Sequence, residues 1–376
     1  MSEASLFLFG TLCHTPLRDL VMGGETRVEV KPAKLRDHAV HWAGRADHPM
    51  LVPAPGDVAS GVVVTGMTRE QRARFDFFEG GFDYDLVPAK VEVEGQEVMA
   101  LRYDAPAGVR PGSRWQLTDW AETYAGLWLA AAEEAMSYYG AISSEDLARR
   151  MPMIRLRASA RLRAEEGMPA TLRTAMSLSG DVEIEEFRRP YSNYFVAAEA
   201  DLKFRRFDGT MSASVNRAGF VMGDAVTVLP YDPEHDLVLL VEQFRMGPLL
   251  RGDPRPWMLE PIAGRVDPGE APETTARREA LEEAKLTLGK LHFVNAHYPS
   301  PGAVTEYIYA YVGEARLQGR GGEVAGLATE DENIRSHVIP FERLMELVRT
   351  GEAGTGPLVV SAYWLALNRA RLRGSA

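Results

Sequence analysis

The sequence predicts a mixed α/β (α+β) protein with two folded units and a helical connector between them. Short strand-like runs alternate with turn signals from residue 28 to 104, which is typical of a small barrel-like unit. A helical texture with one apolar stripe begins at residue 115. Strands return near residue 178 and then alternate with helices. We therefore expect domains at 1–114 and 179–376, with the connector at 115–178.

Composition narrows the class of function. The 376 residues include 42 Lys and Arg against 53 Asp and Glu, a formal net charge of −11. This balance argues against a nucleic-acid partner, which basic side chains would have to hold through its phosphates. Cys13 is the one cysteine, so no intrachain disulfide can form. We find no secretory leader and no run of about 18 apolar residues, so we expect a soluble cytoplasmic protein without a membrane partner.

The elements of the first unit follow from local signals. Residues 6–12 have the apolar character of a buried strand that runs into a turn. A short helix is expected at 68–78, with Thr68 as its N-cap. Residues 89–103 hold two strand-like runs around Gly95, which predicts a hairpin.

The connector predicts two helices. The first covers 115–139, where aromatic and aliphatic residues recur at helical spacing. The second covers 143–175 and should break at Pro152 and Pro169, because proline removes a helix hydrogen bond. Six arginines in this segment form either a solvated helix face or a specific anion site: Arg149, Arg150, Arg155, Arg157, Arg161 and Arg163.

A helix of the C-terminal unit, 272–286, carries the strongest chemical signal. Glu279, Glu282 and Glu283 lie at i, i+3 and i+4, so they share one helix face. Like charges at this spacing cost about 0.2–0.5 kcal/mol per pair, and a bound cation would reverse the sign. Mg²⁺ prefers oxygen ligands and is commonly shared between carboxylates and phosphates. The alternative is a solvated acidic face with neighbouring arginines as counter-charges.

The loop before this helix favours the metal site. The segment fits G-x5-E-x7-R-E-U-x-E-E, where U is aliphatic, and six fixed matches arise by chance at roughly 1 in 10⁷ per start position. The fixed positions are Gly264, Glu270, Arg278, Glu279, Glu282 and Glu283. The pattern resembles the Nudix box of the Nudix hydrolases. Ala280 is small for the U position, and Lys285 replaces a glycine that ends the helix, so we expect a longer helix or strain there.

The resemblance extends over about 185–373 and is to the ADP-ribose pyrophosphatases. It implies a Nudix α/β/α sandwich that hydrolyses ADP-ribose to AMP and ribose 5-phosphate with Mg²⁺, or with Mn²⁺ in its place. The segments that carry it, besides the box, are Glu242–Arg245, Pro256–Glu260, Ser300–Gly302 with Glu306, and Glu330–Arg335.

The resemblance also implies roles for individual residues. Glu330 matches the general base on a loop, and Glu282 lies close to the catalytic metals. The implied metal ligands are the Ala263 carbonyl, Glu279, Glu283 and Glu332.

Two arginines are candidates for contacts to the substrate. Arg245 suits the pyrophosphate or the terminal ribose, since arginine can bind phosphate oxygens bidentately. An ordinary ion pair at the end of a strand is its alternative. Arg217 is a weaker candidate. In the resembling enzymes, strands before the box complete the partner's site, so strands within 182–217 imply a homodimer through the Nudix domain.

Two segments of the first unit suggest a second chemistry. Phe9–Leu12 follows an apolar strand, and Phe75–Tyr84 follows about 70 residues later. In this order they resemble the γ-glutamylcyclotransferase-like (AIG2-like) fold over about 5–105. The resemblance implies that backbone N–H groups of Gly10, Thr11 and Leu12 hold a γ-glutamyl substrate. It implies that Glu79 is the general acid and base, with a pKa raised by apolar neighbours; the alternative is that Glu79 only caps or pairs after its helix.

The combination of the two units resembles the TrgB-like proteins associated with tellurite resistance. This association names a phenotype and implies no mechanism. Two other functions remain open for the Nudix unit. It could hydrolyse another nucleoside diphosphate derivative, such as a nucleotide sugar or NADH. It could also be a non-catalytic sensor of ADP-ribose, although a pure binder has no need of clustered glutamates.

Overall fold

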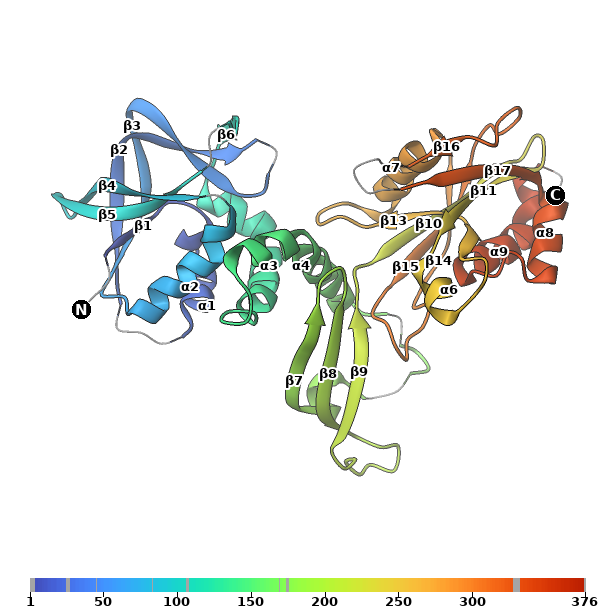
Figure 1. The fold of residues 1–376 in the computed structure, drawn as a ribbon, viewed down its shortest axis with the longest axis horizontal. Coiled ribbons are helices and arrows are strands. Elements are labelled where there is room, and N and C mark those ends of the chain that lie inside the picture. Colours follow the sequence, from blue (N-terminus) through green and yellow to red (C-terminus); the bar gives the residue numbers. More distant parts are fainter. Residues whose placement is uncertain are drawn as a thin grey trace. The chain divides into compact units, whose positions relative to one another are not determined.

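The computed structural model describes residues 4–24, 28–44, 46–82, 84–105, 108–168, 170–173, 176–326 and 332–374 (Figure 1). The chain divides into two compact units, Met1–Met168 and Pro169–Ala376. This division lies ten residues before the expected boundary at 178. No helix in the described ranges is long and apolar enough to cross a membrane.

A closed β-barrel forms the first unit. Its sheet has the order β3-β1-β5-β4-β2-β6, and β2 also pairs with β3, so five strands close on themselves and β6 extends the sheet. Strand β1 runs parallel to β5 and antiparallel to β3. The strands are β1 (Leu6–Leu8), β2 (Glu29–Ala43), β3 (Pro49–Thr65), β4 (Asp85–Val93), β5 (Gln96–Asp104) and β6 (Pro111–Arg114). The barrel-like prediction is confirmed.

Helices pack against this barrel. The predicted N-cap of α2 is confirmed, because Thr68 and Gln71 exchange the two hydrogen bonds of a capping box. The helices are η1 (Thr11–Cys13), α1 (Thr15–Met22), α2 (Arg69–Glu79), η2 (Gly80–Phe82), α3 (Leu117–Met136) and α4 (Ser144–Glu165).

The two helices expected as a connector, α3 and α4, share the core of the barrel unit. Trp120 on α3 and Ile154 on α4 are fully buried in the same cluster as the barrel strands. Helix α4 runs through Pro152 without ending, so the predicted break there is wrong. The buried residues on both sides, Leu147 and Ile154, stabilise the helix enough to tolerate one missing hydrogen bond.

The arginines of α4 belong mostly to ion pairs within the unit. Arg157 is buried, and its guanidinium donates to both carboxylate oxygens of Glu134 on α3 at 2.5–3.2 Å. The expected solvated face is therefore wrong for Arg157. Arg161 makes an exposed pair with Glu133 at 2.7 Å. The charge of Arg157 thus joins α3 to α4.

The second unit is an α/β/α sandwich, as expected. Its main sheet has the order β14-β15-β10-β11-β17-β16, with β12 paired to β11 and β13 to β10. The strands are β10 (Ala225–Asp232), β11 (Leu237–Phe244), β12 (Trp257–Glu260), β13 (Ile262–Arg265), β14 (Leu291–His297), β15 (Ile308–Glu314), β16 (Val324–Ala325) and β17 (Ile334–Pro340). The helices are α6 (Met246–Arg251), α7 (Pro272–Ala284), α8 (Phe341–Thr350) and α9 (Gly356–Leu372).

The alternation of side chains along β11 creates the two layers. Leu239 and Val241 point into the core under α7, whereas Val238 and Leu240 point into the core under α8 and α9. Helix α7 meets the sheet through the alanine stripe Ala276, Ala280 and Ala284, which are almost fully buried. Because alanines are small, α7 lies close to the sheet, and the glutamates beside them reach the strands.

A separate three-stranded sheet precedes the sandwich (Figure 1). Its strands are β7 (Val182–Ser192), β8 (Val196–Phe204) and β9 (Val215–Val221), preceded by the short helix α5 (Leu178–Asp181). Large apolar side chains on this sheet are exposed, and they include Ile184, Phe187, Tyr191 and Phe220.

The Arg157–Glu134 pair yields a stability prediction. Arg157→Ala should lower the free energy of unfolding by about 3–5 kcal/mol, because it leaves a carboxylate buried without its partner. Arg161→Ala, one turn further along α4, is the matched control and should cost no more than about 1 kcal/mol, since its pair is exposed. Urea unfolding measures both. Equal effects of the two changes would contradict the assignment.

Candidate functional sites

Helix α7 begins and ends near where the sequence predicts. Pro272 is its first residue, and Lys285 ends it in the left-handed conformation, with φ 49° and ψ 41°. Of the two expected outcomes, a longer helix or strain, the structure has the strained one, at a cost of about 1–2 kcal/mol. Two bonds offset part of this cost: Arg320 donates to the carbonyls of Ala284 and Lys285, at 3.2 and 3.1 Å.

The carboxylate of Glu279 lies directly against β13. A Cβ atom placed on Gly264 would overlap that carboxylate, so any other residue here would displace the side chain of Glu279. The glycine that opens the sequence pattern and the glutamate fifteen residues later therefore form one close contact between strand and helix.

Glu283 is the most deeply buried carboxylate of α7, with 2% of its surface exposed. Its Oε2 accepts a long hydrogen bond from the Ala263 N–H at 3.4 Å. Burial, reinforced by the charges of Glu279 and Glu332, raises the pKa of Glu283 to about 9. Burial likewise raises the pKa of Glu279 to about 7, against the opposing charge of Arg278. Two such carboxylates are ionised together at neutral pH only with a further positive charge nearby.

Arg278 connects the helix to the preceding loop. Its guanidinium donates to Glu270 at 3.1 Å and to the Arg265 carbonyl at 3.2 Å. It also donates to Glu279 at 2.7 Å and to Glu282 at 3.0 Å, so it is a counter-charge of this acidic face, as the alternative interpretation of the helix expected. Helical spacing alone would have suggested the bond to Glu282, since i and i+4 side chains face each other.

The donors at this site are oxygens. Glu279, Glu283 and the Ala263 backbone offer the hard ligands that Mg²⁺ prefers. The electrostatic effect of Glu332 on both glutamates indicates that it is near them. Across the described ranges no three His, Cys, Asp or Glu side chains form a complete metal cluster. Glu330, the expected general base, lies outside the described residues.

Arg245 lies at the N-cap of α6, immediately after β11. Its Nε donates to Glu260 Oε2 at 2.7 Å, so the structure has the ion pair that was its alternative role. Its side chain remains 40% exposed, and its charge lowers the pKa of Glu283 and of Glu306, both of which burial raises. Arg245 therefore lies near the carboxylates while keeping part of its surface open.

Arg217, the weaker candidate from the sequence, and Arg265 have different surroundings. Arg217 is exposed on β9 and donates to the Asn216 carbonyl at 2.8 Å. Within the described residues no hydrogen bond or ion pair joins it to α7. Arg265, which the sequence analysis did not single out, stacks on Tyr194 with 3.8 Å between Cζ and the ring centroid. It lowers the pKa of Glu306 as Arg245 does.

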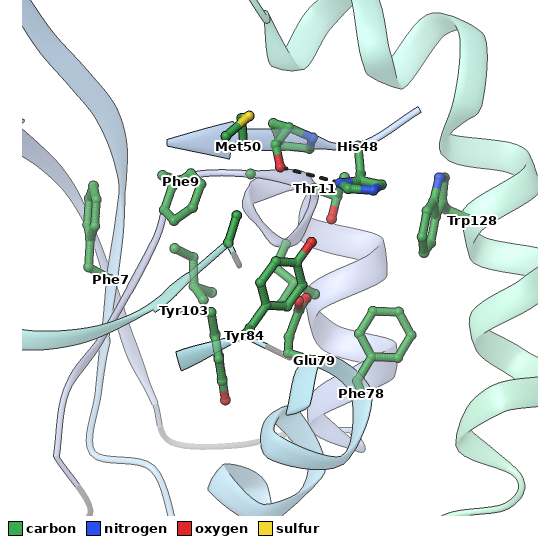
Figure 2. Close-up of a pocket in the computed structure, with 15 residues that line it drawn as sticks. Phe7, Phe9, Thr11, His48, Met50, Phe78, Glu79, Tyr84, Tyr103 and Trp128 are labelled. Atoms are coloured by element: carbon green, nitrogen blue, oxygen red, sulfur yellow. Dashed lines mark hydrogen bonds between the residues drawn. The ribbon is translucent and has the colours of Figure 1, made fainter. Parts of the chain in front are cut away.

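A second candidate site lies in the first unit, at the open end of β1. A cavity of ≈ 100 Å³ is lined by the three predicted substrate-binding residues Gly10, Thr11 and Leu12 together with Glu79. Figure 2 shows Glu79 and Tyr84 in the middle of this cavity. Residues 67–69 positions apart in the sequence thus line one pocket, as the resemblance to the γ-glutamylcyclotransferase-like fold implied.

Local geometry explains the first of these residues. A Cβ atom on Gly10 would lie 2.8 Å from Pro49 Cγ, so glycine permits β3 to approach the loop. Thr11 and Leu12 begin the turn η1, and the first N–H groups of such a turn have no partner within it. These N–H groups are therefore free of the turn's own hydrogen bonds.

The electrostatics of Glu79 match the expectation. It is the last residue of α2, and burial raises its pKa to about 7. Burial and the charge of Glu79 also raise the pKa of Tyr84. Tyr103, on another wall, donates from its hydroxyl to Asp76 at 2.6 Å. A carboxyl with a pKa near neutrality can both take up and release a proton at physiological pH.

Comparisons with known proteins give a family match for each unit. Residues 222–359 match the family model of the NUDIX domain. Residues 6–122 match the model described as "Gamma-glutamyl cyclotransferase, AIG2-like". The chain belongs to the Nudix family and carries an AIG2-like domain before its Nudix domain.

The curated relatives match the second unit. The ADP-ribose pyrophosphatase of Haemophilus influenzae is 36% identical over 198 residues, which are 52% of this chain and 90% of the relative. That of Escherichia coli K12 is 36% identical over 193 residues, 51% of this chain and 91% of the relative. The GDP-mannose pyrophosphatase of Enterobacter sp. 638 is 32% identical over 191 residues, 51% of this chain and 98% of the relative.

The raised pKa of Glu79 predicts a pH dependence of stability. The folded protein holds this proton up to about pH 7, whereas an unperturbed glutamate loses it near 4.5. The contribution of Glu79 to the free energy of unfolding is therefore greatest at low pH. It falls by at most about 3 kcal/mol as pH rises from 4.5 to 7, and then levels off.

Glu79→Gln removes this titration. Urea unfolding at pH 5, 6, 7 and 8 measures the free energy of unfolding of wild type and of the variant. As pH rises to 7, the value for wild type should fall relative to that of the variant, and above pH 7 the difference should stay constant. A difference that is constant across this range would show that Glu79 titrates normally.

Proposed function

We propose that the Nudix unit hydrolyses the pyrophosphate of ADP-ribose to AMP and ribose 5-phosphate in the presence of Mg²⁺. The observation that carries the proposal is the buried pair Glu279 and Glu283 on α7, whose raised pKa values call for a cation. Relatives named ADP-ribose pyrophosphatase, aligned over 90% of their length, support the choice of substrate.

The proposed chemistry assigns tasks to named residues. Glu279, Glu283, Glu332 and the Ala263 carbonyl would hold Mg²⁺ or Mn²⁺. The metal would supply charge neutralisation on the phosphate oxygens and a more acidic water. Glu330 would take the proton of that water, and Glu282 would assist it.

Substrate contacts are proposed for the two arginines. The open part of Arg245 would meet the pyrophosphate or the terminal ribose, while its bond to Glu260 holds the guanidinium in place. Arg217 is a contact only if a second subunit brings it to the site, since it is exposed on β9.

A nucleotide sugar is the second candidate substrate, because relatives named GDP-mannose pyrophosphatase align over 98% of their length at 32% identity. NADH is a further candidate of the same class. A non-catalytic ADP-ribose sensor would account for the fold, but it would not explain why α7 carries buried carboxylates.

We propose a second activity for the first unit, favoured by the placement of Glu79 in the cavity at the end of β1. The α-amine of a γ-glutamyl amide would attack its own γ-carbonyl carbon. A C–N bond of the 5-oxoproline ring forms, and the amide C–N bond breaks. Glu79 would take the proton from the attacking amine and deliver it to the leaving amine.

Release of AMP from ADP-ribose with Mg²⁺ tests the main proposal. Wild type should form AMP, and Glu283→Gln should lose more than about 100-fold of the rate, since loss of an outer-shell partner alone costs about 10–100-fold. Glu79→Gln is the control in the other unit and should keep the rate. Tight binding of ADP-ribose without release of AMP would identify a sensor. If ADP-ribose is neither bound nor cleaved, GDP-mannose and NADH are the next substrates to test.

A homodimer through the Nudix unit is proposed from the exposed apolar side chains of β7–β9. Light scattering at micromolar concentration should give twice the 41.5 kDa of one chain. Ile184→Asp should shift the mass to the monomer, because it places a charge on this sheet. Leu367→Asp, at a residue that is 87% exposed on α9, should leave the dimer intact. A monomeric wild type would disprove this assembly.

A further inference from the structure

One side chain from a distant loop holds the C-terminal end of α7. Nη2 of Arg320 donates to the carbonyls of Ala284 and Lys285, at 3.2 and 3.1 Å. The last carbonyls of a helix have no partner within the helix, and a cation is favourable at this negative end of the helix dipole. Arg320 therefore supplies a donor and a positive charge at the end of the helix that carries Glu283.

The conformation of Lys285 makes this support important. Its φ of 49° lies in the left-handed region, which is unfavourable for a residue with a Cβ atom and accessible to glycine. The strain acts against the turn in which α7 ends. The two bonds from Arg320 act in the opposite direction, because they are made to the carbonyls of this same turn.

The loop that carries Arg320 is itself anchored in the core. The backbone N–H of Arg320 donates to the Leu317 carbonyl at 3.1 Å. Leu317 is fully buried in the same core cluster as the alanines of α7, and its N–H donates to Asp232 at 2.9 Å. The guanidinium of Arg320 therefore reaches the end of α7 from a fixed point of the fold.

The same guanidinium also links α7 to the strand pair β16–β17. It pairs with Glu323 at 3.3 Å. The Glu323 carbonyl accepts a hydrogen bond from the Ser336 N–H of β17 at 2.9 Å. Strand β17 begins two residues after Glu332. Arg320 thus lies between the two segments that bring the carboxylates of Glu283 and Glu332 together.

We propose that Arg320 is a positioning residue of the metal site: by holding the strained end of α7 at Lys285, it fixes Glu283 relative to Glu332. The inference rests on the metal site proposed above, and it adds a residue that lies outside both the helix and the sequence pattern of the box. The guanidinium is engaged by two carbonyls and by Glu323, so it acts through the position of α7 and not by contact with the substrate.

Removal of the guanidinium tests the proposal in the full chain. Arg320→Ala should weaken Mn²⁺ binding about 10-fold, the lower end of the loss seen when an outer-shell partner of a metal ligand is removed. The electron paramagnetic resonance signal of the free ion measures this affinity. At saturating Mg²⁺ the variant should have a lower kcat for release of AMP from ADP-ribose and a nearly unchanged KM, because no contact to the substrate is lost.

A matched control lies in the same loop. Arg316 is an exposed arginine four positions before Arg320, and Arg316→Ala should bind Mn²⁺ and release AMP as wild type does. If Arg320→Ala also keeps the wild-type Mn²⁺ affinity, the proposal is wrong.

Substitution of Lys285 separates positioning from a general loss of structure. Lys285→Gly relieves the strain, so the double variant with Arg320→Ala should recover most of the wild-type Mn²⁺ affinity and kcat. Lys285→Ala retains a Cβ atom, so its double variant with Arg320→Ala should not recover. The same affinity in both double variants would show that the end of α7 does not transmit the effect, and this would overturn the proposal.

Failure of this proposal and failure of the hydrolase proposal give different results. If neither wild type nor any variant releases AMP while the Mn²⁺ affinities follow the expected order, the substrate assignment fails and the role of Arg320 stands. If wild type releases AMP and Arg320→Ala equals it in kcat and in Mn²⁺ affinity, the hydrolase stands and the role of Arg320 is wrong. A wild type that binds no Mn²⁺ and releases no AMP would overturn both.

Discussion

The burial of Glu279 and Glu283 between α7 and β13 is the constraint on which the Nudix unit depends. Three alanines bring the helix close to the sheet, and Gly264 leaves space for the first carboxylate. The same closeness removes both carboxylates from water and raises the pKa of Glu279 to about 7 and that of Glu283 to about 9. The fold therefore maintains an acidic site that Arg278 compensates only in part, which is unfavourable for stability and suited to binding a cation.

Arg278 limits this cost without removing the site. Its guanidinium satisfies Glu270, Glu282 and one oxygen of Glu279. Among the described residues, Glu283 receives only a long bond from the Ala263 N–H. The carboxylates around α7 are thus of two kinds. Glu270, Glu282 and one oxygen of Glu279 pair with Arg278, whereas Glu283 has no such ion pair among the described residues. This division explains why one helix can carry several glutamates with different tasks.

Much of this arrangement could be predicted because it follows from the spacing of residues within short segments of the sequence. The spacing of the box places the glutamates on one face of α7. Pro152 was misjudged because the packing of Leu147 and Ile154 outweighs the lost hydrogen bond. The bonds of Arg157 to Glu134 and the stacking of Arg265 on Tyr194 join residues 23 and 71 positions apart, and no local pattern reports them. Glu330 lies outside the described residues, so its role stays a prediction.

Binding of Mn²⁺ in place of Mg²⁺, followed through the electron paramagnetic resonance signal of the free ion, tests the central claim most directly. Wild type should bind the ion. Glu283→Gln should weaken binding at least about 10-fold, because it removes the negative charge of a buried carboxylate that would be a ligand. Glu273→Gln changes an exposed residue in the first turn of the same helix and should bind as wild type does. Equal Mn²⁺ affinity in wild type and Glu283→Gln would contradict the assignment of α7 as the metal-binding helix.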